Sequence, residues 1–251
     1  MSRVLNLILT HQPPEAVARL LAWWRAVADA DDVLLAYGGQ RQDFEGIPHP
    51  RKVFIDDPGL RTRDHQRDLQ DISAVIHAGA EWLRRPENTG FTHVFSVEFD
   101  HLPVVRDLHS RLIARLQSEQ AGVLAHWVER VDRTGHRHYL YHKSKPEILA
   151  YWRSLSVRAD REVVLSMMGT GSFWTRAAFL DLASHLGSVR AYFELHLPTV
   201  AHHLGYRVRN LPEQNAWVKN LPDPEINVAA AMAGGAWTVH PIKETPAVTP
   251  W

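Results

Sequence analysis

The chain has 251 residues, of which 45% are hydrophobic and 22% charged; this composition is typical of a globular protein and excludes a disordered or low-complexity one. Its 28 basic and 28 acidic residues balance, so it lacks the basic excess that binds a nucleic acid polymer. The absence of cysteine excludes disulfides, thiolate zinc sites, iron–sulfur clusters and a cysteine nucleophile.

The first half of the chain alternates short apolar runs with helical patterns. The runs predict buried strands over residues 4–9, 33–37, 53–55 and 93–99. Apolar residues recurring every three or four positions predict helices after Pro13-Pro14, over 66–85 and from Pro103 onward. Such alternation predicts an α/β fold, a mainly parallel twisted sheet with helices on both faces.

The second half is less regular. Residues 123–131 and 136–142 flank the turn sequence Asp132-Arg133-Thr134-Gly135 and predict a β-hairpin. The remaining patterns predict strands and helices in the following order: a helix over 146–155, a strand over 163–168, helices over 175–186 and 191–204, a strand over 206–211 and an extended tail.

Transmembrane and secretory segments are not expected. No stretch reaches the ~20 apolar residues that cross a bilayer. The apolar N-terminal run stops at His11, which is too early for a signal peptide. We therefore expect a cytoplasmic protein.

Polar residues follow three of the predicted strands. In an open α/β sheet, ligands bind outside the carboxyl ends of the strands. This rule brings together Thr10-His11, Tyr37-Gly38-Gly39 and Glu98-Phe99-Asp100. Strand alternation puts the Glu98 and Asp100 carboxylates on one side, and such oxygen ligands suit Mg²⁺ or Mn²⁺. A strand that simply ends in a solvated acidic turn explains the pattern equally well.

At this point the sequence resembles the GT-A type glycosyltransferases of the nucleotide-diphospho-sugar transferase superfamily. Glu98-Phe99-Asp100 stands where those enzymes carry an Asp-x-Asp-like motif. Residues 168–179 (MGTGSFWTRAAF) resemble their Gly-rich acceptor loop, and 193–208 (FELHLPTVAHHLGYRV) their acidic helix and following strand. His240-Pro241-Ile242-Lys243 resembles a late element whose His completes the metal site. The shared order of these motifs carries the resemblance.

The resemblance implies a single GT-A-like domain over 1–251, with a nucleotide-sugar-binding half (1–120) and an acceptor-binding half with the tail (121–251). It implies hexosyl or related sugar transfer from a nucleotide-diphosphate donor to an unknown acceptor, assisted by Mn²⁺ or Mg²⁺. The implied site residues fall into four groups: catalytic Glu194 and Asp100; donor-binding Thr10, His11, Tyr37, Gly38, Arg61, Arg63 and Glu98; acceptor-binding Gly169, Gly171, Ser172 and Trp174; metal-binding Asp100, Glu98 and His240.

Some of these assignments have ordinary structural alternatives. Arg61 and Arg63 either contact a diphosphate or form salt bridges at a helix start. Trp174 is expected to pack against an acceptor sugar, although most tryptophans lie in cores. Glu194 is expected to be an ionised base at a helix N-terminus, or only to stabilise that helix. His136, His138 and His142 could share a zinc site, but a polar hairpin face is the better explanation.

Two other functions stay open. Phe193 replaces an acid of the motif and Glu98 is one methylene longer than Asp; both would suit a catalytically idle nucleotide- or glycan-binding module. A sugar nucleotidyltransferase would need a Gly-rich basic loop after the first strand, where this chain has Thr10-His11-Gln12-Pro13-Pro14.

Overall fold

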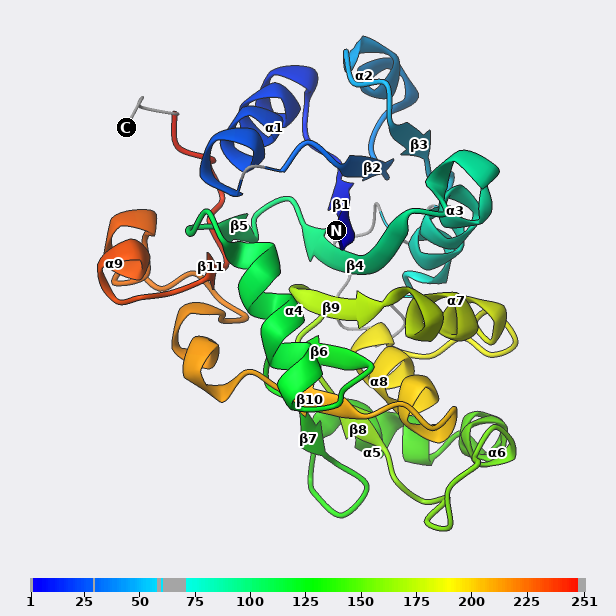
Figure 1. Cartoon of the computed structure of the whole chain (residues 1–251). Coiled ribbons are helices and arrows are strands. Elements are labelled where there is room, and N and C mark those ends of the chain that lie inside the picture. Colours follow the sequence, from blue (N-terminus) through cyan, green and yellow to red (C-terminus); the bar gives the residue numbers. More distant parts are fainter. Residues whose placement is uncertain (1, 29, 58–59, 61–70, 248–251) are drawn as a thin grey trace.

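The computed structural model describes residues 2–28, 30–57, 60 and 71–247, and its centre is one mixed sheet (Figure 1). The strands lie in the order β10-β6-β9-β4-β1-β2-β3. β9 is antiparallel to its neighbours, and the other pairs are parallel. The strands are β1 (Arg3–Thr10), β2 (Val33–Tyr37), β3 (Lys52–Phe54), β4 (Phe91–Glu98), β6 (Val123–Ala125), β9 (Ser172–Thr175) and β10 (Val208–Asn210). The predicted mainly parallel α/β sheet, with its first four strands, is confirmed.

The central strand β1 is apolar on both sides, which explains why helices cover both faces of the sheet. Val4 and Ile8 belong to the core on one face, and Leu5 and Leu7 to the core on the other. All four are buried. Because successive side chains point to opposite faces, a continuous apolar run requires cover on both.

The helices divide between these two cores (Figure 1). One face is covered by α1 (Pro14–Ala28), α4 (Leu108–Ser118) and α9 (Val228–Ala233). The other is covered by α3 (Ser73–Arg84), α5 (Arg137–Lys143), α6 (Pro146–Ser154), α7 (Arg176–Ser184) and α8 (Phe193–His203). The remaining helical segments are α2 (Arg41–Gly46), η3 (Pro86–Asn88) and η4 (Pro212–Trp217).

Two small sheets complete the fold. β7 (Glu129–Arg130) pairs with β8 (Leu165–Ser166), and β5 (Leu102–Pro103) pairs with β11 (Thr238–Val239), both antiparallel. The second pair brings the C-terminal segment to the end of β4, where the Ile242 N–H donates to the Asp100 carbonyl at 2.8 Å. Residues about 140 positions apart in sequence thereby become neighbours.

The predicted hairpin over 123–142 is wrong. Its first strand is divided between β6 and β7, which belong to different sheets, and its second is the helix α5. Tyr139 and His142, the buried residues of α5, are three positions apart, which is helical spacing. The three histidines therefore do not line one face of a strand, which removes the basis of a zinc site there.

Other predicted boundaries also change. Pro103 does not open a helix: it lies in β5, and α4 begins at Leu108. Residues 172–175, expected to lead from a loop into a helix, form β9 before α7 begins. The helices α2 and α9 were not predicted, because six-residue helices show less than two turns of any pattern.

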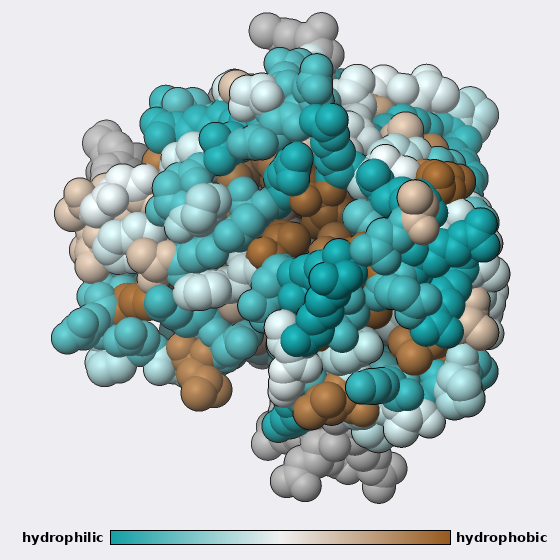
Figure 2. All heavy atoms as spheres, turned by 90° about the horizontal axis from the view of Figure 1, so that it is seen from below, coloured by the Kyte–Doolittle hydropathy of each residue, from teal (hydrophilic) through white to brown (hydrophobic). Residues whose placement is uncertain are grey.

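Most side chains on the face shown in Figure 2 are hydrophilic, and hydrophobic ones gather in a hollow near its centre. Among the described residues, no helix combines the length and the apolar character that crossing a bilayer requires.

Candidate functional site

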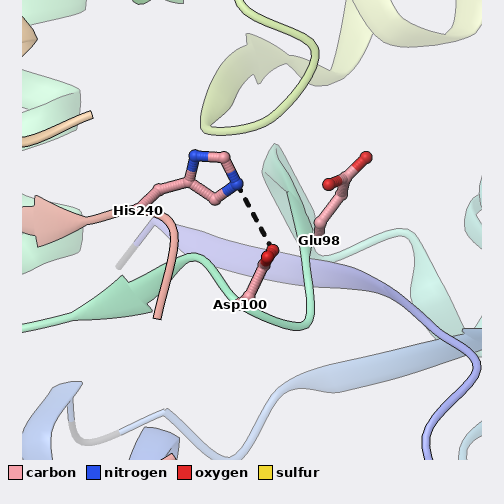
Figure 3. A group of neighbouring side chains, drawn as sticks. All are labelled: Glu98, Asp100 and His240. Atoms are coloured by element: carbon pink, nitrogen blue, oxygen red, sulfur yellow. Dashed lines mark ion pairs between the residues drawn. The ribbon is translucent and has the colours of Figure 1, made fainter. Parts of the chain in front are cut away.

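Three side chains that can ligate a metal converge where β4 ends. Glu98 is the last residue of β4, Asp100 lies in the turn that follows, and His240 comes directly after β11. One ligand atom from each lies within 4.8 Å of the others. Figure 3 shows Asp100 and His240 facing one another, with Glu98 beside them. Two carboxylates and an imidazole form a donor set that suits Mn²⁺ or Mg²⁺.

The Asp100 carboxylate is buried, yet the described residues leave it short of hydrogen bonds. Its Oδ1 has no hydrogen-bond donor among them. The His240 Nε2 lies 3.3 Å from this oxygen. Its Oδ2 pairs with the Lys243 Nζ at 2.5 Å. A buried acceptor without a donor is costly, and a cation at this position would satisfy it.

The tautomer of His240 favours metal binding. Its Nδ1 lies 2.7 Å from the Lys219 carbonyl oxygen, which can only accept, so Nδ1 carries the proton. With Nδ1 engaged in this way, Nε2 is the ring nitrogen that faces Asp100 and can serve as a metal ligand. A backbone carbonyl that fixes the other ring nitrogen is the usual arrangement around metal-ligating histidines.

The carboxyl groups of this cluster have opposite pKa shifts. Burial, and next the charge of Asp100, raise the pKa of Glu98 to about 7. Burial also raises the pKa of Asp100, but His240 and Lys243 together lower it below its usual value. At neutral pH the pair therefore holds Asp100 ionised and Glu98 near half-protonated, so Glu98 can gain or lose a proton when a cation binds.

The loop between β8 and β9 (residues 167–171) packs against the end of β4. The Thr170 hydroxyl accepts the Glu98 N–H at 2.8 Å. Gly171 has a positive φ of 77°, and a Cβ there would lie 2.3 Å from the His101 ring. Only glycine allows the loop to approach this closely.

Glu194 lies on the first turn of α8, beside this loop. Its Oε1 accepts the Gly169 N–H at 2.9 Å. Gly169 precedes Thr170, whose hydroxyl accepts the Glu98 N–H, so the same loop connects Glu194 to the metal-ligand cluster. Burial raises the pKa of Glu194 itself, against the hydrogen bonds that lower it. The helix N-terminus, which was expected to favour the ionised form of Glu194, is therefore opposed by burial.

Several predicted donor-binding residues meet at one edge of the sheet, but Thr10, Tyr37 and Gly38 are buried there. Thr10 pairs with Tyr37 in register. The Thr10 hydroxyl accepts the Gln12 N–H, and Tyr37 packs in the core against the rings of Phe44 and Phe54. Burial raises the pKa of Tyr37 to about 12. The Thr10 and Tyr37 side chains therefore lie beneath the surface at this edge of the sheet.

The other predicted donor-binding residues have different placements. The exposed His11 ring lies edge-on to Phe99, with centroids 4.9 Å apart, so an aromatic pair stands beside the metal-ligand cluster. The Gly38 N–H donates to the Thr10 carbonyl at 2.9 Å, joining the ends of two strands. Arg61 and Arg63 lie outside the described residues.

The predicted acceptor-binding residues are not all at the site. The Gly169 N–H donates to Glu194, and Gly171 lies so close to the His101 ring that a Cβ would not fit between them. Trp174 is fully buried in β9, where its Nε1 donates to the Ser172 hydroxyl at 2.8 Å. Trp174 therefore cannot stack on an acceptor, and Ser172 is buried with it. This prediction is wrong because β9 carries the segment into the middle of the sheet.

Three residues near the site were not given roles from the sequence. Lys243 is the last residue of the His240-Pro241-Ile242-Lys243 element, so the sequence resemblance could have indicated its position at the site. Trp127 and Lys219 line a pocket that also contains Glu194. Trp127 comes two residues after β6, a position that the rule on strand ends could have indicated.

No family model and no curated protein matches this chain. Solved structures that resemble it include WbbM, a bifunctional glycosyltransferase, in its apo form (15% identity, TM-score 0.46, covering 95% of this chain and 45% of that one). Another is the mannosyltransferase PcManGT from Pyrobaculum calidifontis in complex with GDP-Man and Mn²⁺ (14% identity, TM-score 0.45, 84% of this chain and 55% of that one). A third is 2-C-methyl-D-erythritol 4-phosphate cytidylyltransferase from Thermus thermophilus (17% identity, TM-score 0.43, 93% and 98%).

The chain thus spans about half the length of these two glycosyltransferase chains. The structural neighbours are glycosyltransferases and a nucleotidyltransferase, the classes that the sequence analysis considered.

Proposed function

We propose that this protein transfers a sugar from a nucleoside-diphosphate donor to an acceptor hydroxyl, with a divalent cation bound by Asp100, Glu98 and His240. The supporting observation is the convergence of these ligand atoms within 4.8 Å at the carboxyl edge of a parallel sheet. This edge is where nucleotides bind in open α/β sheets. In this proposal residues 1–120 bind the donor and 121–251 the acceptor.

The bound cation would neutralise the charge that develops on the leaving diphosphate. Asp100 supplies an ionised carboxylate at neutral pH, and His240 presents Nε2 because Lys219 holds its Nδ1 proton. Glu98 releases its proton when it becomes a ligand. Lys243, whose side chain is 61% exposed, reaches Asp100 from the surface and supplies a positive charge at the same place.

Glu194 is our candidate for the general base. Its Oε1 is engaged by the Gly169 N–H, which fixes the carboxylate. The acceptor hydroxyl would pass its proton to Glu194 as its oxygen bonds to the anomeric carbon of the donor. The bond from that carbon to the diphosphate breaks at the same time. A pKa raised by burial makes the carboxylate a stronger base than an exposed Glu.

Nucleotide binding and its metal dependence test this proposal. Thermal unfolding would be followed with UDP, GDP, CDP and ADP, each with and without Mn²⁺. A nucleotide present at 100 times its Kd adds about 2.7 kcal/mol to the free energy of unfolding. We expect stabilisation by at least one nucleotide that requires Mn²⁺ and is lost in Asp100→Ala. Replacement of the exposed Glu225 by Ala is the matched control.

Transfer itself is tested by the release of nucleoside diphosphate from nucleotide sugars carrying the base so identified. Mn²⁺-dependent release that Asp100→Ala abolishes supports the enzyme. Tight binding without release of nucleotide from any donor would favour a binding module instead. No stabilisation by any nucleotide would contradict the proposal.

A further inference from the structure

An exposed tryptophan stands beside Glu194. Trp127 is 45% exposed and has a φ of 54°, an unusual conformation for a bulky residue. Its Nε1 donates to the Val218 carbonyl at 2.7 Å, and its backbone N–H donates to the Asn215 side chain at 3.2 Å. The first bond orients the indole and the second holds the Trp127 backbone, while much of the side-chain surface stays open. Strained, fixed and exposed aromatic residues occur at ligand sites.

This indole forms one wall of a pocket of about 330 Å³. Glu129, His136, Lys219 and Glu194 provide polar groups around it. The Lys219 ammonium lies 5.2 Å from the Trp127 ring centroid. The His136 Nδ1 is buried and has no hydrogen-bond partner within the described part of the chain. The pocket thus combines the exposed Trp127 indole with several polar groups that can hydrogen-bond to hydroxyls. Its volume is in the range of small-molecule binding sites.

The charges around the pocket limit what it can bind. Two carboxyl groups, Glu129 and Glu194, face a single ammonium group, so a phosphate or other strong anion would be repelled. Polar groups on several sides would be left unpaired by a purely hydrocarbon ligand. A sugar ring satisfies both demands, because its C–H face packs on an aromatic ring and its hydroxyls both donate and accept.

The pocket also adjoins the metal-ligand cluster. Glu194 lines it and accepts the N–H of Gly169, the residue before Thr170, which hydrogen-bonds to the Glu98 backbone. Lys219 lines it too, and its carbonyl holds the His240 ring while its N–H donates to the His240 carbonyl at 3.0 Å. An occupant of the pocket would therefore present a hydroxyl to Glu194, next to the place where the donor is proposed to bind.

We propose that this pocket is the acceptor site, that the acceptor is a saccharide, and that Trp127 is the platform on which its ring packs. The role as acceptor site rests on the proposed function; saccharide binding by the pocket does not. Trp127 takes the place that the sequence analysis gave to Trp174.

The test is saturation-transfer NMR with the full chain and a panel of sugars at millimolar concentration: the methyl glycosides of glucose, galactose, mannose and N-acetylglucosamine, and their common disaccharides. Spectra would be recorded with and without Mn²⁺ and UDP or GDP. We expect at least one sugar to bind the wild type, Trp127→Ala to weaken it at least tenfold, and Trp127→Phe to retain most of the binding. Val157→Ala, which trims a side chain that is 75% exposed, is the control and should bind normally.

Nucleotide binding in the same samples separates the two proposals. Trp127→Ala should bind Mn²⁺ and nucleotide as the wild type does, which shows that it is folded. Sugar binding that depends on Trp127 without any nucleotide binding would uphold the pocket and contradict the proposed function. Nucleotide binding without binding of any sugar, or sugar binding unchanged in Trp127→Ala, would overturn the acceptor pocket.

Discussion

Glu98→Gln should stabilise the metal-free protein at alkaline pH. The pKa of Glu98 is raised to about 7 from a usual 4.5, so folding favours the protonated form. Such a group stabilises the fold at low pH, and this contribution is lost as the pH rises from about 4.5 through 7. At pH 8 the ionised carboxyl therefore costs about 3 kcal/mol, at 1.36 kcal/mol per pKa unit. The neutral amide has nearly the same shape and removes this cost.

The assay is thermal unfolding in the presence of a chelator. For a chain of this size, about 3 kcal/mol corresponds to a rise in Tm of roughly 6–12 °C at pH 8. Below about pH 3.5 the two proteins should melt together, since Glu98 is then mostly protonated in both the folded and the unfolded wild type. Glu225→Gln, at an exposed carboxylate, should change Tm little at either pH. An unchanged or lower Tm for Glu98→Gln at pH 8 would refute the reasoning.

The same carboxyl should make metal binding depend on pH. A cation must displace the Glu98 proton, so the apparent Kd for Mn²⁺ should rise about tenfold for each pH unit below 7. Above pH 7 this dependence should level off. Glu98→Gln should bind Mn²⁺ more weakly, and its Kd should depend less on pH than that of the wild type. Isothermal titration calorimetry measures both, and a pH-independent Kd in the wild type would place the metal elsewhere.

Three other substitutions test the remaining roles. Asp100→Ala should abolish Mn²⁺-dependent nucleotide binding in the thermal assay, since this buried carboxylate lies next to both the His240 Nε2 and the Lys243 Nζ; unchanged binding would exclude it as a ligand. Lys243→Met should bind Mn²⁺ alone several-fold more tightly by calorimetry, because the ammonium no longer competes for the Asp100 Oδ2; weaker binding would contradict this competition. Glu194→Gln should keep nucleotide binding while sugar transfer falls roughly 10²–10⁴-fold. Transfer at the wild-type rate would exclude Glu194 as the base.

The sequence predicts the part of the fold that depends on local patterns. Continuous apolar runs identify β1, β2 and β4, and their carboxyl ends carry the polar residues that the structure brings to one edge. The proximity of His240 to Asp100 has no local signal. It depends on β5 and β11, which are two residues each and pair across more than 130 positions of sequence. Only the resemblance of the 240–243 element suggested it.

The two tryptophans show why the acceptor side was harder to predict. Trp174 follows two glycines, which suggests an open loop, but Ser172–Thr175 is an antiparallel strand between β4 and β6, so its side chain is enclosed by neighbours that its own sequence does not reveal. Trp127 follows β6, a strand of only three residues. Trp127 lies just beyond the carboxyl end of β6, as Glu98 lies at the carboxyl end of β4, where the rule on strand ends expects ligands. Because residues 123–131 were predicted as one hairpin strand, the end of β6 at Ala125 was not recognised. The exposed Trp127 indole, which lines the same pocket as Glu194, was therefore missed as well.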